Sequence, residues 1–167
     1  SSTFTTTGGT VNNTYGSRVI YFDGTDYNFA TGTSSVTAPG GTVRITAFNN
    51  YTNLTAVFPG TSSILTSYGS LSSGTVTQIT SGTFATALKI ISGTLDLGAT
   101  GTLTLNNGGL LTTSSGSMAI TGGSLRAGTA GVDLVVNQFG SGTLVIASTI
   151  TNATTGQNGP VSYTHLT

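Results

Sequence analysis

The sequence predicts an all-β protein, with a parallel β-helix of short coils in its C-terminal half and an aromatic-rich β head before it. Three observations support this prediction. The 167 residues include 25 glycines, 36 threonines and 20 serines but only one lysine and no glutamate, which disfavours exposed helices. A strand-opening phrase recurs after residue 73. Most of the tyrosines and phenylalanines lie before it.

The charge balance excludes several classes of partner. Four lysines and arginines stand against four aspartates, so the chain lacks the basic face that a nucleic-acid binder needs. No apolar run approaches the ~18–20 residues of a membrane span. The chain has no cysteine, which leaves neither disulfides nor a cysteine-based metal site.

The chain begins at Ser1, which we interpret as a processed N-terminus. Together with the sparse charge, this predicts an extracellular or cell-surface location.

The phrase consists of glycine, then threonine or serine, then apolar residues at alternating positions. It begins at Gly74, Gly82, Gly93, Gly101, Gly116, Gly123 and Gly142. The first six starts form pairs that are 8, 8 and 7 residues apart, and a third apolar run follows each pair, at residues 88–91, 110–111 and 132–136. Three short strands for every 19 to 26 residues are typical of a solenoid with three faces.

Alternation within the phrase predicts which side chains point inward. The expected inward pairs are Leu95 and Leu97, Leu103 and Leu105, Met118 and Ile120, and Leu144 and Ile146. Stacking one coil on the next at about 4.8 Å would pair the backbones and bury these apolar columns, while glycine supplies the corners with positive φ. The alternative is an antiparallel, jelly-roll-like β-sandwich, in which hairpins recur every 8–12 residues or so.

Residues 98–107 and 140–146 (GSGTLVI) resemble the autotransporter-associated β-strand repeats of large secreted bacterial β-helix proteins. The resemblance covers residues 74–152. It implies a right-handed parallel β-helix on a cell surface or in an extracellular fibre, and it brings no catalytic residues.

The pattern divides the chain into four parts: an N-terminal arm at 1–10, a head or capping module at 11–73, solenoid repeats at 74–152 and a tail at 153–167. Five of six tyrosines and five of seven phenylalanines lie before residue 74, and strands are expected at 18–22, 43–48 and 54–58. A solenoid needs a cap at its end, because the unpaired strands of a terminal coil can pair with another chain. Residues 161–167 (VSYTHLT) resemble a translated sequencing adapter, which would leave the natural C-terminus unknown.

Catalytic chemistry finds little support, and we predict neither an enzyme nor a cofactor. His165 is the only histidine, in the tail, so a nucleophilic triad is not favoured. The four aspartates do not stack in the expected register, which disfavours a carboxylate pair. Those at 23 and 26 belong to the segment Asp23-Gly24-Thr25-Asp26-Tyr27-Asn28, which has oxygen ligands for calcium but is better explained as a turn.

Four asparagines, Asn12, Asn50, Asn53 and Asn152, stand in Asn-x-Ser/Thr sequences. That number is what chance gives in a chain so rich in serine and threonine. The lack of surface charge nevertheless suggests covalent glycans at these positions.

The expected function is structural: a secreted subunit of a self-assembling filament or surface layer, with other copies of itself as partners. Strand addition between subunits would use Thr3, Phe4 and Thr5 of the arm, or Leu144 and Ile146. The alternative is an adhesin or carbohydrate-binding module in which tyrosines of the head stack on sugars. Its candidate residues are Tyr15, Tyr27, Tyr51 and Tyr68.

Overall fold

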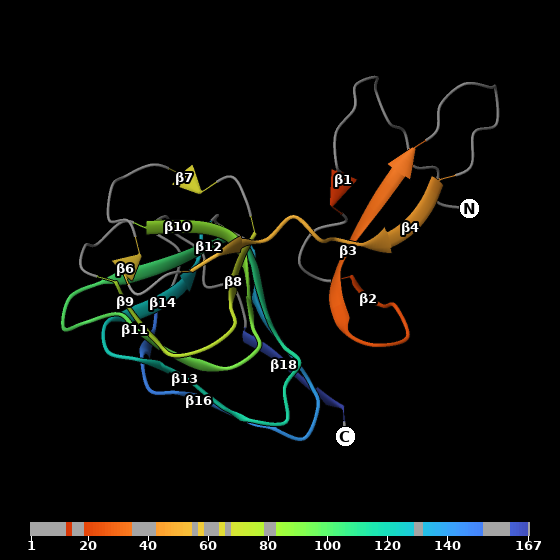
Figure 1. The fold of residues 1–167 in the computed structure, drawn as a ribbon. Coiled ribbons are helices and arrows are strands. Elements are labelled where there is room, and N and C mark those ends of the chain that lie inside the picture. Colours follow the sequence, from red (N-terminus) through yellow and green to blue (C-terminus); the bar gives the residue numbers. More distant parts are fainter. Residues whose placement is uncertain are drawn as a thin grey trace.

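The structure is a computed structural model that describes residues 13–14, 19–34, 43–54, 57–58, 64–65, 68–78, 83–128, 132–151 and 161–166. Every regular element in these residues is a β-strand (Figure 1). The strands from β5 onward pair only in parallel, whereas β1 to β4 pair antiparallel. The predicted all-β class with a C-terminal β-solenoid is therefore confirmed, and the antiparallel sandwich is wrong for this part of the chain.

The first face of the solenoid is a five-stranded sheet. Its strands, from one end of the stack to the other, are β6 (Val57–Phe58), β9 (Thr75–Gln78), β11 (Gly93–Asp96), β13 (Ser117–Thr121) and β16 (Thr143–Ile146). Each of the last four begins within one residue of a glycine of the recurring phrase, so this phrase does open strands.

A nine-stranded sheet forms the second and third faces, because two of its strands bend around a corner. They are β10 (Thr83–Ile90) and β12 (Thr102–Thr112), whose mutual register is interrupted between Ala85 and Ala87. The second face adds β7 (Ile64–Leu65), β14 (Ser124–Ala127) and β17 (Thr149–Ile150) to their first halves. The third face adds β5 (Thr52–Asn53), β8 (Gly69–Leu71), β15 (Leu134–Phe139) and β18 (Val161–Leu166) to their second halves.

Apolar columns from the three faces fill the inside of the solenoid. On the first face Val76, Leu95, Ile120 and Ile146 stack in register, and all except Ile146 are at most 2% exposed. Of the other predicted inward residues, Leu97, Leu103, Leu105 and Met118 are also buried in this core, and Leu144 packs against it half-buried. Burial of such side chains contributes roughly 1.5–3 kcal/mol each, which makes stacking the main source of stability.

The head is a small antiparallel sheet beside the solenoid (Figure 1). It contains β1 (Asn13–Thr14), β2 (Ile20–Phe22), β3 (Tyr27–Ser34) and β4 (Val43–Ala47), and β3 pairs with each of the other three. The turn between β2 and β3 spans Asp23 to Asp26, with the Asp23 amide bonded to the Asp26 carbonyl at 3.2 Å.

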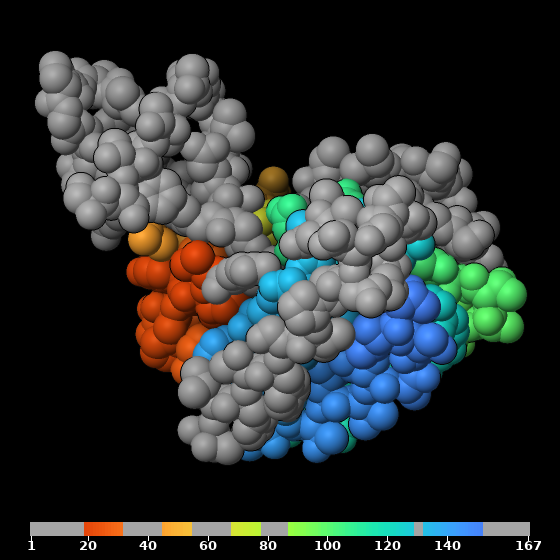
Figure 2. Space-filling view, turned by 180° about the vertical axis from the view of Figure 1, so that it is seen from behind, coloured from red at the N-terminus to blue at the C-terminus, as the bar shows by residue number. Residues whose placement is uncertain are grey.

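The head packs on the outer side of the third face and forms a second core there. Phe29 and Phe48 from the head side meet Tyr68, Ala87, Leu111 and Phe139 from the solenoid side. Neighbouring residues of one strand thus serve different cores, since Leu110 belongs to the inner core and Leu111 to the outer one. In Figure 2 the red surface of the head borders the light-blue surface of the C-terminal coils.

The parallel sheets extend beyond the residues marked by the phrase. The strands from β5 to β8 lie within the range assigned to the head, and β18 lies in the tail. The expected strand at 54–58 contributes β6 to the first face, not to the head. Strands of two or three residues carry too little alternation to be recognised in the sequence, and they are stabilised by the neighbouring coil. The adapter origin of residues 161–167 stays a prediction.

Candidate functional site

The three faces end in the same way at the C-terminal side of the stack. Among the described strands, β16 pairs only with β13, β17 only with β14 and β18 only with β15. We call β16, β17 and β18 the trailing edge. An edge strand presents backbone donors and acceptors that can template pairing with another chain.

Backbone hydrogen bonds show which groups of the trailing edge point away from the stack. The amides of Thr149 and Thr151 donate to the Gly123 and Leu125 carbonyls of the preceding coil, each at 3.0 Å. Consecutive residues of a strand direct their backbone groups to opposite sides. The amide of Ile150 therefore points to the open side of β17, where it can donate to a further strand.

Apolar side chains accompany these backbone groups. The predicted assembly residues Leu144 and Ile146 lie in β16, stacked on Met118 and Ile120, and they are only partly buried against the inner core. Ile150 shares a register position with the fully buried Leu125 but is 44% exposed, and Val145 is 49% exposed. The last coil thus leaves part of the inner core uncovered by any described residue. Thr3, Phe4 and Thr5 lie outside the described residues.

The opposite end of the stack is also an edge. Among the described strands, β6, β7 and β5 are the end members of the first, second and third faces, and we call them the leading edge. In Figure 1 the strands descend in order from β6 to β16. Because every solenoid strand runs parallel to its neighbours, the leading edge of one copy has the direction needed to follow the trailing edge of another.

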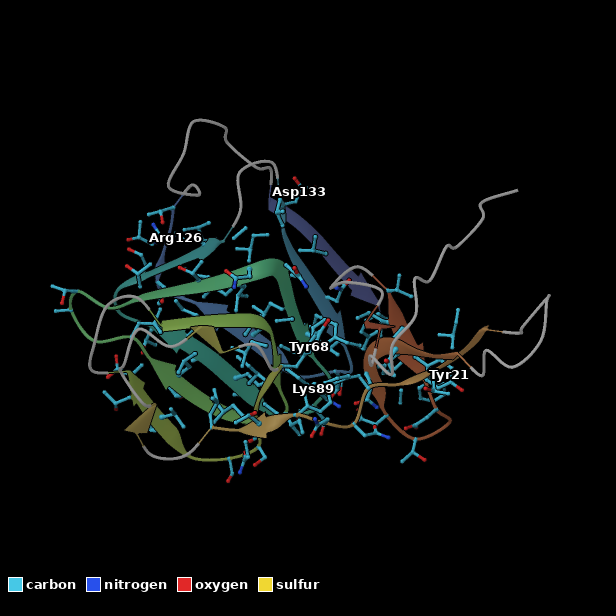
Figure 3. The ribbon with its side chains drawn as sticks, turned by 90° about the horizontal axis from the view of Figure 1, so that it is seen from above. Tyr21, Tyr68, Lys89, Arg126 and Asp133 are labelled. Carbon is cyan, nitrogen blue, oxygen red and sulfur yellow. The ribbon has the colours of Figure 1, made fainter. Side chains whose placement is uncertain are left out.

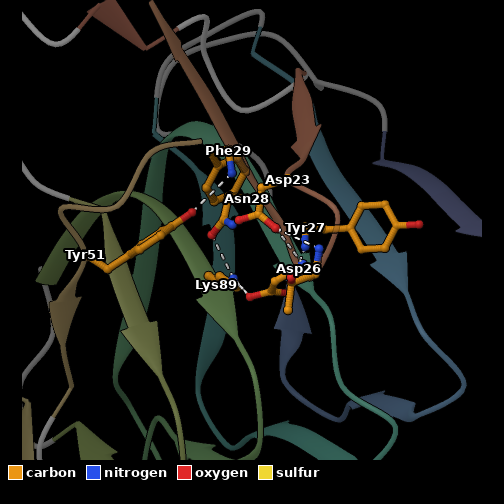
Figure 4. A network of polar contacts seen from close by, with 8 residues as sticks. Asp23, Asp26, Tyr27, Asn28, Phe29, Tyr51 and Lys89 are labelled. Carbon is orange, nitrogen blue, oxygen red and sulfur yellow. Dashed lines mark hydrogen bonds and ion pairs between the residues drawn. The ribbon is translucent and has the colours of Figure 1, made fainter. Parts of the chain in front are cut away.

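A second polar site lies where the head meets the solenoid, around Lys89 of β10 (Figure 4). Lys89 points outward from the third face, but the head covers it. Its side chain is 3% exposed, and Nζ lies 2.6 Å from Oδ2 of Asp26 and 2.9 Å from Oδ1 of Asn28. The ring of Tyr51 is 5.5 Å away, measured from Nζ to the ring centroid. This contact fixes the head hairpin on the solenoid.

The tyrosines considered for sugar binding are packed among other aromatic rings. Tyr68 is 3% exposed and lies 5.2 Å from Phe29, centroid to centroid. Tyr27 stacks on Phe139 of β15 at 4.2 Å, and Tyr51 meets Phe48 edge-on at 5.1 Å. Figure 3 shows Tyr68 and Lys89 between the solenoid and the head. These rings hold the head in place and form no exposed coplanar platform; Tyr15 lies outside the described residues.

The segment considered for calcium adopts a turn. Oδ1 of Asp23 accepts hydrogen bonds from the amides of Thr25 and Asp26, both at 2.9 Å. The amides of Asp26 and then Thr25 hold the pKa of Asp23 below its ordinary value. The oxygens of Asp26 and Asn28 face Lys89, so the ammonium group occupies the place where a cation would bind. Among the described residues no cluster of three His, Cys, Asp or Glu could hold a metal.

Tyr51 contributes a half-buried phenol to the contact around Lys89. Its oxygen accepts a hydrogen bond from the Phe29 amide at 3.1 Å. Burial raises the pKa of Tyr51, so the phenol stays neutral at all physiological pH values.

The other charged residues of the solenoid are dispersed over its three faces. Oδ1 of Asp96, on the first face, accepts a hydrogen bond from the Gly98 amide at 2.9 Å, whereas Asp133 precedes β15 on the third face. Nε of Arg126 donates to Thr104 Oγ1 at 3.0 Å on the second face.

Asn50 and Asn53 are exposed, as glycosylation would require. Asn12 and Asn152 lie outside the described residues, and nothing is described of the His165 side chain.

Sequence reasoning missed the role of Lys89. The available signal was a lone lysine inside the apolar run at residues 88–91, at the position that alternation turns outward. An outward lysine is ordinarily solvated, and only the docking of the head explains its burial.

The parallel stacking of the described strands on three faces defines a class, the parallel β-solenoids. Comparison with known protein families, with curated proteins and with solved structures finds no match. No helix in the described part of the chain has the length and apolarity that crossing a membrane requires.

Proposed function

We propose that the chain is a secreted structural protein whose copies stack end to end into a filament or layer at a cell surface. The observation that carries this proposal is the pair of edges, leading and trailing, at which the described strands of the same parallel sheets end. A contact between the two different ends of identical subunits does not close, and it therefore continues into a polymer.

Side chains at the trailing edge support the proposal. Val145 and Ile150 are exposed although they are large and apolar, and Leu144 and Ile146 are partly buried against the inner core. A further coil stacked on β16 and β17 would cover the inward residues Leu144, Ile146 and Ile150. It would do so in the way that β11 covers Val76 and β13 covers Leu95. Each buried methylene would contribute about 0.8 kcal/mol.

The surface and the repeat agree with an extracellular role. The chain carries only four lysines and arginines and four aspartates, so little charge repulsion opposes close association. The likeness of residues 74–152 to autotransporter-associated repeats, which occur in secreted β-helix proteins, supports this role by analogy alone. Glycans on Asn50 and Asn53 belong to the same proposal, and intact mass from the native host would reveal them.

The test is electron microscopy and sedimentation of the purified chain over a series of concentrations, with two matched variants. Ile150→Lys places a charge at an inward position of the trailing edge, where a following coil would bury it. Thr149→Lys places the same charge on the neighbouring residue, whose register partner is the outward Ser124. Both sites are exposed in the single chain, so both variants should fold.

We expect filaments or sheets from the wild type and from Thr149→Lys, and single particles from Ile150→Lys. The proposal is wrong if the wild type stays monodisperse at every concentration. It is also wrong if Ile150→Lys assembles as readily as Thr149→Lys, because the trailing edge would then not be the contact.

A further inference from the structure

The contact around Lys89 brings three reactive groups together across the boundary between head and solenoid. Lys89 Nζ lies within hydrogen-bonding distance of both the Asn28 carboxamide, at 2.9 Å, and the Asp26 carboxylate, at 2.6 Å. The sequence separation is 61 residues for the first pair and 63 for the second. An amine in contact with both a carboxamide and a carboxylate supplies the components of an amide transfer.

The environment of the amine favours such a reaction. Lys89 is 2% exposed and Asn28 is 5% exposed, whereas the side chain of Asp26 is 39% exposed. The register neighbour of Lys89 on β12 is the fully buried Leu111. Phe29, next to Asn28 on β3, is also fully buried. Such surroundings keep water away from the Lys89 amine and the Asn28 carboxamide.

The fold also supplies the proximity that an unassisted amide transfer lacks. A free lysine and a free asparagine side chain react negligibly in water, but holding two groups in contact replaces an encounter with an effectively unimolecular step. Strand β3 holds Asn28 and strand β10 holds Lys89. The aromatic packing of Phe29 on Tyr68 and of Tyr27 on Phe139 keeps the two strands in place.

We propose that Lys89 and Asn28 form an intramolecular isopeptide bond, with Asp26 as the proton carrier. Asp26 accepts a proton from the Lys89 ammonium, and the neutral amine attacks Cγ of Asn28. A bond forms between Lys89 Nζ and Asn28 Cγ, and the bond between Cγ and Nδ2 breaks. Asp26 passes its proton to the leaving nitrogen, the attacking nitrogen gives up a second proton to it, and the leaving group departs as an ammonium ion.

The reaction is balanced without any co-reactant. An ammonium and a carboxamide become a secondary amide and an ammonium ion, and the Asp26 carboxylate is regenerated. The chain loses one ammonia and the positive charge of its only lysine. The product joins β3 of the head covalently to β10 of the solenoid, so the head can no longer separate from the coils.

The positions of the basic residues make the bond easy to detect. Arginines at 18, 44 and 126 and the lysine at 89 are the only sites for trypsin, and trypsin does not cleave after an acylated lysine. After denaturation, an unlinked chain releases the separate peptides 19–44 and 45–89. A linked chain releases 19–44 joined to 45–126, and no peptide ends at Lys89.

The experiment is intact mass and tryptic peptide mapping of the wild type and of Asp26→Ala, with circular dichroism to show that each is folded. We expect the wild type to lose one ammonia and to give the linked peptide, and Asp26→Ala to give the two free peptides. If the Asp26→Ala chain does not fold, Asp26→Asn takes its place.

Free peptides 19–44 and 45–89 from the folded wild type overturn the proposal. So does an ammonia loss that maps to a succinimide at Asn107–Gly108, which would give the same intact mass. A link that persists in both Asp26 variants overturns the role assigned to Asp26. None of these outcomes depends on whether the chain assembles into filaments.

Discussion

Gly74 and Gly93 show why the coils turn on glycine. They occupy adjacent coils, and both have positive φ, 75° for Gly74 and 101° for Gly93. A Cβ on Gly93 would collide with the backbone carbonyl of Gly74, whereas a Cβ on Gly74 would have nothing within 4 Å. The first position thus combines a conformational requirement with close backbone approach, and the second has the conformational requirement alone.

These two glycines therefore form a matched pair of alanine substitutions. Gly74→Ala should lower the free energy of unfolding by about 1–2 kcal/mol, the cost of a left-handed residue with a side chain. Gly93→Ala should cost at least about 3 kcal/mol, because the collision adds to that strain. Urea unfolding of both variants measures the difference. Equal costs would show that close approach of the coils at Gly93 is unimportant.

Asp23 makes the stability of the head turn depend on pH. Because its folded pKa lies below the ordinary value of 3.8, its contribution to stability is complete above pH 3.8. That contribution is lost as pH falls through the folded pKa. Asp23→Asn keeps a side-chain oxygen for the amides of Thr25 and Asp26 but cannot titrate. Acid unfolding followed by tyrosine fluorescence should thus be less steep below pH 3.8 for Asp23→Asn. If Asp23→Asn loses stability below pH 3.8 as steeply as the wild type, Asp23 does not make this contribution.

At the scale of the element, β12 shows how a single strand serves two cores. Leu110 and Leu111 are both fully buried, but the first faces the inside of the solenoid and the second faces the head. Strict alternation along the strand produces this division. The sequence shows the two leucines at 110–111 as one apolar run, and only the presence of the head explains why the outward one is apolar.

Replacing each leucine by alanine should distinguish the contribution of the inner core from that of the outer core. Both changes should cost about 2–5 kcal/mol, but in different places. Leu110→Ala should speed amide hydrogen exchange in β10, β12 and β15, and Leu111→Ala should speed it first in β2 and β3. Exchange followed by mass spectrometry locates the effect. Identical exchange patterns would mean that the head and the solenoid unfold as one unit.

The predictability of the other elements follows from their length. Strands opened by the phrase, such as β13 and β16, carry two inward apolar residues each, so their period is visible in the sequence. Strands β5, β6 and β7 have two residues each, which is too short for any period. Their pairing depends on the coil that follows, and no local signal in the sequence reports it.

At the scale of the whole molecule, the solenoid was predictable and the docking of the head was not. Because the repeat puts the same type of residue at the same place in each coil, one coil predicts the next, as the column of Val76, Leu95 and Ile120 shows. The head contact joins Lys89 to Asp26 and Asn28, more than 60 residues away in the sequence, and the repeat holds no second copy of it because the chain has one lysine. The trailing-edge residues Leu144 and Ile146 could be predicted because they continue the repeat, whereas the two-residue strand of Ile150 carries no period that would mark that residue.

The low charge of the whole chain leads to a last prediction, about the force behind assembly. Eight charged residues with no net charge leave backbone pairing and apolar burial as the attractions between stacked copies. Raising sodium chloride from 0.01 M to 1 M shortens the screening length from about 30 Å to about 3 Å. Assembly driven by charges would change greatly over this range. We therefore expect the critical concentration, measured by sedimentation, to stay within about threefold of its low-salt value, equivalent to less than about 0.7 kcal/mol. A tenfold rise with salt would show that ion pairs hold the copies together, and the edge contact proposed for β16 and β17 would then be wrong.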